Sequence, residues 1–311
     1  MFYKMTIAAV AVAMITPPVL AQSDSGESGL FTAGAPIGVI NESGEDTTPT
    51  DNVRILGSFH FAESCTVDTE RNLIVVMNAG ASQDAVKNDG YVSLLNPDGT
   101  VHTTKWIGAS RDGLTLNHPL GSAIADGMLY VADGNFVRTF DLESGEPRDA
   151  FEVPEATFLN GIAVSDDGTT YVSNTSDPQR VYRVTADGET SVFIDGEPLA
   201  APNGVATDGD GNIVVVNIGN DEVLTFSPDG ELLLTENAAE GGNDGVVILE
   251  DGTKYVSSVR FGSISKLVPG EDAEIIASGI PSAASICYDP AGNQIIAPMN
   301  ANNALAFITL D

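Results

Sequence analysis

Short apolar stretches of this chain alternate with turns rich in Gly and Asp, and one such phrase recurs along the sequence. Within residues 201–217, an apolar stretch opens on Asn203-Gly204, enters an Asp-Gly turn and continues into a second apolar stretch. The same phrase begins again at Asn160 and at Asp244. Two apolar stretches around a tight Gly/Asp turn are typical of a β-hairpin. The pattern therefore predicts repeated antiparallel strands.

The repeat has a period that identifies its architecture. Six innermost strands can be recognised, and a glycine turn recurs late in each of the first five units, at intervals of 40 to 46 residues: Gly99, Gly145, Gly188, Gly230 and Gly270. A period of this length with about four strands per unit is the signature of a propeller blade. The sequence predicts an all-β fold, a six-bladed β-propeller with four antiparallel strands in each blade.

The ends of the chain set the domain boundaries. The sixth unit has only three strands, so we expect the N-terminal segment Val53–Leu56 to supply the fourth and close the ring, which also removes an exposed strand edge. The propeller then spans residues 52–311, after a polar lead-in at 22–51. Residues 1–21 have a charged start, an apolar run too short to span a membrane and a small-residue end. They predict a signal peptide and a periplasmic or secreted protein.

The charge balance is strongly acidic. The chain of 311 residues has 44 acidic and 13 basic residues and a formal net charge of −31. Such a surface repels phosphate backbones and anionic lipids, so we expect no nucleic-acid partner and no membrane insertion. The expected partner is a small molecule, and the expected oligomeric state is a monomer.

Polar residues stand at matched positions of the innermost strands. Because blades pack radially, the start of each innermost strand should face the central channel at one end. The residues at these positions in units one and three to five are Glu63, Asn160, Asn203 and Asp244. Two carboxylates and two amides form an oxygen-only set that suits Ca²⁺ and disfavours zinc. The competing interpretation is that Asn-Gly and Asp-Gly are ordinary turn residues that lead into strands.

With these residues in place, the chain resembles the senescence marker protein/gluconolactonase family of calcium-dependent propeller hydrolases, whose relatives include diisopropyl-fluorophosphatase and paraoxonase-like lactonases. The resemblance covers roughly residues 53–311 and depends on Glu63, Asn160, Pro202-Asn203-Gly204 and Asn243-Asp244-Gly245. It implies that the four polar residues hold one catalytic Ca²⁺ at the channel mouth. It also implies that Asp244 is the catalytic base or nucleophile.

The resemblance has departures. Where lactonases of the family often carry an arginine, two residues before Asn160, this chain has Phe158, which implies a less polar substrate or none. His60 and His118 lie on loops before the first two innermost strands and are weaker candidates for lining the mouth. For His60, a solvated loop side chain is the favoured interpretation. The implied function is an exported Ca²⁺-dependent hydrolase of a lactone or related ester. The alternative is a non-catalytic propeller that binds a small ligand or a protein on its loop face.

The two cysteines, Cys65 and Cys287, belong to the innermost strands of units one and six, which are neighbours only in a closed ring. They have opposite parity along their strands, so their side chains point either toward each other or both away. Export would permit a disulfide. The competing interpretation is two buried, unpaired thiols.

Overall fold

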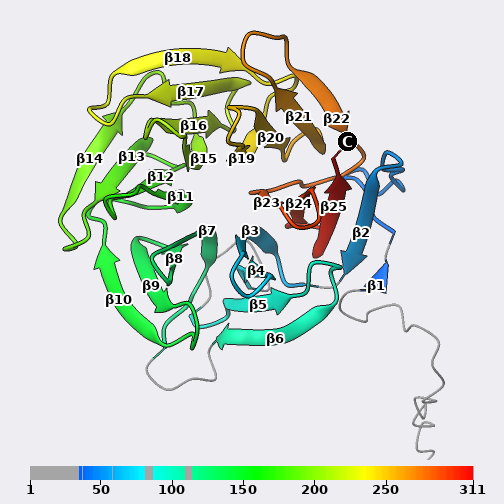
Figure 1. Ribbon diagram of the computed structural model, residues 1–311, viewed down its shortest axis with the longest axis horizontal. Helices are drawn as coiled ribbons and strands as arrows, with labels where there is room; N and C mark the ends of the chain where they lie inside the picture. The colour runs from blue at the N-terminus through cyan, green and yellow to red at the C-terminus, as the bar shows by residue number, and fades with distance from the viewer. Residues whose placement is uncertain (1–34, 37, 58, 81–86, 109–113, 311) are drawn as a thin grey trace, which may run out of the picture.

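The protein is a six-bladed β-propeller, seen down its axis in Figure 1. The computed structural model describes residues 35–36, 38–57, 59–80, 87–108 and 114–310. The predicted signal peptide at 1–21 lies outside these residues. In the described part of the chain, no helix is long and apolar enough to cross a membrane.

Each of the first five blades is a four-stranded antiparallel sheet whose first strand lies innermost. Blade one contains β3 (Ala62–Asp68), β4 (Leu73–Asn78), β5 (Tyr91–Leu95) and β6 (Val101–Gly108). Blade two contains β7 (Pro119–Ala125), β8 (Met128–Asp133), β9 (Phe136–Asp141) and β10 (Pro147–Glu152). Blade three contains β11 (Leu159–Val164), β12 (Thr170–Asn174), β13 (Arg180–Val184) and β14 (Thr190–Asp195). Blade four contains β15 (Pro202–Thr207), β16 (Ile213–Asn217), β17 (Glu222–Phe226) and β18 (Leu232–Asn237). Blade five contains β19 (Asn243–Ile248), β20 (Lys254–Ser258), β21 (Ser263–Leu267) and β22 (Glu274–Ala277).

Blade six confirms the predicted closure. Its sheet combines β23 (Cys287–Asp289), β24 (Gln294–Met299) and β25 (Ala304–Thr309) with the N-terminal strands β2 (Val53–Gly57) and β1 (Ala35–Pro36). β2 pairs with β25 along its whole length, from Val53 opposite Ile308 to Gly57 opposite Ala304. β1 adds a short fifth strand outside β2. The two ends of the propeller are therefore hydrogen-bonded into one sheet.

The hydrophobic core is divided into six clusters, one in each interface between neighbouring blades. Alternation along the strands explains this division, because successive side chains point to opposite faces of a sheet. In β2, Ile55 belongs to the cluster between blades five and six, and the adjacent Leu56 belongs to the cluster between blades six and one. The closing strand thus contributes to two interfaces at once.

The innermost strands have a feature that sequence patterning did not reveal. In β3, β7, β11, β15 and β19 the pairing register shifts at the same place, one or two residues after the strand begins. A bulge leaves a residue out of the pairing ladder and redirects its side chain. In units one and three to five, this residue is Glu63, Asn160, Asn203 or Asp244. The bulges explain why these side chains leave the alternating pattern.

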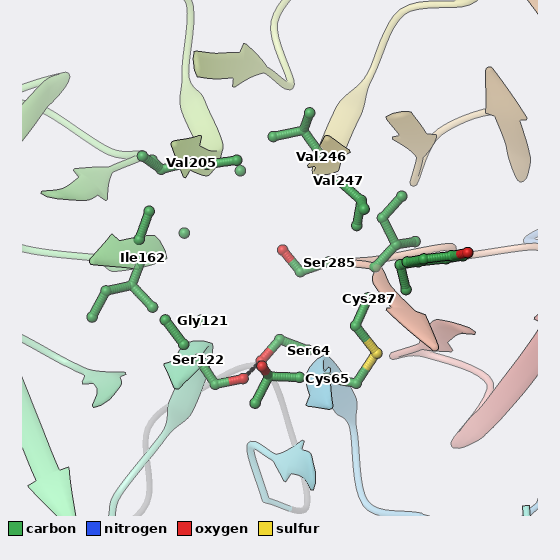
Figure 2. Close-up of a pocket in the computed structure, with 18 of the residues that line it drawn as sticks. Ser64, Cys65, Gly121, Ser122, Ile162, Val205, Val246, Val247, Ser285 and Cys287 are labelled. Carbon is green, nitrogen blue, oxygen red and sulfur yellow. Dashed lines mark hydrogen bonds between the residues drawn. A yellow bond between two sulfur atoms is a disulfide. The ribbon is translucent and has the colours of Figure 1, made fainter. Parts of the chain in front are cut away.

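A small residue follows each of these positions because neighbouring innermost strands approach each other closely. A Cβ on Gly161 would lie 2.1 Å from the carbonyl oxygen of Asn203, and one on Gly204 would lie 2.6 Å from that of Asp244. Where serine replaces glycine, it bonds across the same gap: the Ser64 hydroxyl donates to the Leu120 carbonyl. Figure 2 shows Ser64, Gly121 and Ser285 around the channel.

This close approach predicts the effect of one added methyl group. Gly161→Ala should destabilise the protein by about 3 kcal/mol, because its contact atom is backbone and cannot move without widening the ring. Urea denaturation of both proteins measures the difference. Gly209→Ala is the matched control, since nothing lies within 4 Å of its Cβ position, and it should change stability little. Equal stability of the two variants would contradict a tightly packed ring.

Candidate metal site and substrate cavity

A cavity of about 290 Å³ lies at the end of the channel where the innermost strands begin. All four candidate ligands line it: Glu63, Asn160, Asn203 and Asp244. Each is 5% exposed or less. The repeat therefore brings together four buried oxygen-bearing side chains that lie up to 181 positions apart in the sequence (63 to 244).

Three of these side chains have buried oxygen atoms without a hydrogen-bond partner among the described residues. The atoms are Asn160 Oδ1, Asn203 Oδ1 and Asp244 Oδ1. A buried polar atom that has lost water without gaining a partner costs free energy, so such atoms are uncommon and call for an explanation. A ligand that accepts electron pairs from oxygen would satisfy all three of them.

Glu63 differs from the other three because it has a protein partner. Asn300, which follows β24 in blade six, donates from its Nδ2 to Glu63 Oε2 at 2.8 Å. Asn300 Oδ1 in turn accepts the N–H of Ala301 at 2.6 Å, which fixes the orientation of the amide. This contact crosses the interface between the first and last blades, and it holds one Glu63 oxygen in place beside the cavity.

Burial is the largest influence on the pKa values of the two carboxyl groups, Glu63 and Asp244. It raises the pKa of Glu63 from 4.5 to about 7, against the opposing effect of the Asn300 hydrogen bond. Burial and then the nearby charge of Glu63 raise the pKa of Asp244 well above its ordinary value. Two neighbouring buried carboxylates repel each other, so without a cation the site favours at least one proton.

The donor set fits a hard cation. In the described residues, no group of three His, Cys, Asp or Glu side chains could hold a metal. The candidate ligands at the matched strand positions are two carboxylates and two amides. Ca²⁺ accepts such mixtures of carboxylate, amide and water oxygens in flexible geometry. Glu63, Asn160, Asn203 and Asp244 could therefore hold Ca²⁺, whose charge two carboxylates would balance.

The three weaker candidates have different places. His118 and Phe158 line the cavity, together with Phe61 from the loop before β3. His60 does not line it: its side chain is exposed, and its ring lies edge-on to Tyr91, with centroids 5.9 Å apart. The exposed side chain agrees with the interpretation of His60 as a solvated loop residue.

Sequence reasoning missed a second repeated feature that holds the cavity loops. Side chains at the ends of the second strands accept backbone N–H groups from the loops that lead into the innermost strands. Asn174 Oδ1 accepts from Thr157 and Phe158, and Asp133 Oδ1 accepts from Asn117 and His118. Asn78 and Asn217 accept N–H groups of His60 and Ala200 in the same way. Aligning the ends of the second strands would have located these residues.

The structure has a disulfide between Cys65 and Cys287, whose Cα atoms are 5.5 Å apart (Figure 2). Both residues belong to the cluster between blades six and one. Of the two arrangements that opposite parity allows, the structure therefore has the one in which the side chains point toward each other. Cys65 lies two positions after Glu63. The bond therefore ties blade six to the strand that supplies a candidate ligand.

The fold and the site define a six-bladed propeller with an oxygen-lined cavity at its channel mouth. A family model described as the SMP-30/gluconolactonase/LRE-like region matches residues 64–239, more than half of the chain. The chain belongs to this family. The matched region includes Asn160 and Asn203, while Glu63 and Asp244 lie just outside it. No curated protein matches the chain.

Solved structures show the same fold at low sequence identity. A gluconolactonase from Xanthomonas campestris is similar with a TM-score of 0.65 and 17% identity, over 83% of this chain and 90% of that one. A putative gluconolactonase has a TM-score of 0.64 and 17% identity, over 90% of this chain and 94% of its own. A virginiamycin B lyase from Staphylococcus aureus has a TM-score of 0.56 and 16% identity, over 89% of both chains. At these identities the likeness extends to the fold alone.

Proposed function

We propose that this chain is an exported, Ca²⁺-dependent hydrolase of a small lactone or related ester. The observation that carries the proposal is the group of unpartnered oxygens of Asn160, Asn203 and Asp244 around one cavity, beside Glu63. Membership of the gluconolactonase-like family supports lactonase-type chemistry. The disulfide and the predicted signal peptide both support an oxidising compartment.

Glu63, Asn160, Asn203 and Asp244 would hold the ion. When bound, Ca²⁺ would polarise the substrate carbonyl oxygen and favour negative charge on it. Glu63, held by Asn300, would keep its position while substrate enters. Asp244 would accept the proton of the attacking water, whose oxygen then displaces the alkoxide of the lactone or ester. Alternatively, Asp244 would attack the carbonyl carbon itself and displace that alkoxide, and water would hydrolyse the resulting acyl–Asp bond. Because both carboxyl groups are buried in a small cavity, few water molecules other than the attacking one would reach them.

The rival function is a propeller that only binds a ligand or protein. The buried carboxyl pair argues against it, because such a pair lowers stability at neutral pH unless a cation or proton compensates its charge. A purely structural channel would be more stable with apolar residues at these positions. The cost of keeping Glu63 and Asp244 there favours a chemical role.

Substitution of Asp244 tests the proposal. With Ca²⁺ present, the protein should hydrolyse members of a panel of lactones and aryl esters, and removal of the ion by EDTA should abolish the activity. Asp244→Asn should lower kcat by roughly 100-fold or more, since it removes the proton acceptor and keeps an amide oxygen for the ion. Asp251→Asn, in an exposed turn, is the matched control and should retain activity. Hydrolysis that is insensitive to EDTA would contradict the proposal.

A further inference from the structure

The residues that line the cavity are of two kinds. One group has the polar side chains of Glu63, Asn160, Asn203, Asp244 and Asn300. The other group is mainly apolar or aromatic: Phe61, His118, Leu120, Phe158, Ile218 and Val259. We call this second group the aromatic wall. A ligand that turns a carbonyl toward the oxygen donors presents the rest of its surface to residues of the wall.

Phe61 is held in place by an unusual backbone conformation. Its φ of 50° lies in the left-handed region, which side chains other than glycine adopt at a cost in free energy. Two hydrogen bonds hold it there: its N–H donates to Asn303 Oδ1 at 2.8 Å, and its carbonyl accepts the Ala79 N–H at 3.0 Å. The chain therefore strains its backbone to keep an aromatic ring beside the cavity.

The same contacts connect Phe61 to the rest of the wall. His118 Nδ1 lies 3.1 Å from the Ala79 carbonyl oxygen, so this nitrogen carries the proton and donates. The His118 ring lies between those of Phe61 and Phe158, with centroid separations of 6.3 and 6.2 Å. The three rings form one continuous face from blades one to three, and this face is built before substrate arrives.

The aromatic wall has few side chains that could form hydrogen bonds with the hydroxyl groups of a sugar. Thr175, which also lines the cavity, donates its hydroxyl to the Pro202 carbonyl at 2.8 Å. Among the described lining residues there is no lysine or arginine; the nearby Arg260 is exposed, and its contact is with the Ile218 carbonyl. A substrate hydroxyl buried here without a partner lowers affinity roughly five- to 150-fold.

We propose that the substrates are lactones or esters with an apolar alkyl or aryl substituent, and that Phe61 is a specificity-determining residue that contacts this substituent. The proposal rests on the hydrolase function proposed above. The substituent lies against the Phe61–His118–Phe158 face while the carbonyl faces the oxygen donors. Polyhydroxylated sugar lactones and anionic substrates are disfavoured by the wall and by the acidic surface.

A series of δ-lactones of increasing alkyl length tests the substrate class with the Ca²⁺-loaded protein. Each added methylene that the wall buries should raise kcat/KM roughly three- to fourfold, from δ-valerolactone upward until the cavity is full. Glucono-δ-lactone should be the poorest substrate of the series. An equal or higher kcat/KM for glucono-δ-lactone than for δ-octalactone would overturn the proposal.

Two variants test the role of Phe61. Phe61→Ala should lower the ratio of kcat/KM values for δ-octalactone and δ-valerolactone about tenfold. Asn303→Gly removes the acceptor of the Phe61 N–H and suits the positive φ of position 303, so it should raise KM for δ-octalactone with a smaller change in kcat. Phe261→Ala, at an exposed residue outside the cavity, is the control and should leave the ratio unchanged. An unchanged ratio in Phe61→Ala would remove Phe61 from the specificity assignment.

A binding measurement separates this inference from the hydrolase proposal. If no lactone or ester is hydrolysed, the proposed function fails, but calorimetric titration with a non-hydrolysable 2-alkylcyclopentanone and with δ-gluconolactam still measures the preference of the cavity. Tighter binding of the alkyl ketone, weakened in Phe61→Ala, supports the wall as an apolar binding surface. Tighter binding of the gluconolactam contradicts it.

Discussion

At about pH 7.5, addition of millimolar Ca²⁺ to the metal-free protein should raise its melting temperature by roughly 5–10 °C, and at about pH 4.5 by far less. The reason is the buried pair of Glu63 and Asp244, whose pKa values are both raised in the folded protein. Between the ordinary pKa of Glu63, 4.5, and its folded value of about 7, the folded state binds more protons than the unfolded state. The stability of the metal-free protein therefore falls as pH rises through this window.

The charges of Glu63 and Asp244 can be removed by substitution with amides of nearly the same shape. The double variant Glu63→Gln/Asp244→Asn should flatten the pH dependence between these limits and abolish the Ca²⁺ shift, because neither side chain then titrates. Glu250→Gln, at an exposed acidic residue outside the cavity, is the matched control and should behave as the unaltered protein. Differential scanning calorimetry across the pH range measures both effects. A Ca²⁺ shift of normal size in the double variant would place the ion elsewhere.

A protein that begins at residue 60, and so lacks β2, should aggregate or fail to fold. It loses the partner of β25 along five paired positions and exposes that strand's edge. It also loses Ile55 and Leu56, which fill the interfaces on both sides of blade six. Size-exclusion chromatography and thermal unfolding, with a protein that begins at residue 22 as control, give the result.

Smaller changes to β2 provide a graded version of this experiment. Leu56→Ala, at a position 3% exposed, should cost about 2–5 kcal/mol through the cavity it leaves. Arg54→Ala changes a side chain on the exposed side of the same strand and should cost less. A soluble protein from residue 60 that unfolds cooperatively would show that the ring does not need its N-terminal strand.

The repeat predicted the fold well because periodicity is a property of the whole chain. Six innermost strands, their order and the closure by Val53–Leu56 all follow from where apolar stretches and turns recur. Blade positions also brought Glu63, Asn160, Asn203 and Asp244 to one cavity in the structure. That part of the site could be found because each residue occupies the same position in its own repeat.

The rest of the site depends on contacts between repeats, which a single repeat does not encode. Asn300 reaches Glu63 only across the closed ring, and the bulges that redirect the side chains have no composition signal of their own. Phe61 has a left-handed φ that nothing in its local sequence marks. Nearness in sequence is also a poor guide: His60 is only three residues before Glu63, yet its side chain does not line the cavity.

The closing strand also imposes an order of events on the synthesis of the chain. β2 ends at Gly57 and its partner β25 begins at Ala304, so almost the entire propeller is made before the two can meet. At typical rates of translation, this interval lasts on the order of tens of seconds. During it, Ile55 lacks its neighbours in blades five and six, and Leu56 lacks those in blade six. Asn300 is likewise made near the end of the chain, so its hydrogen bond to Glu63, and with it the complete cavity, can form only after almost the whole propeller has been synthesised.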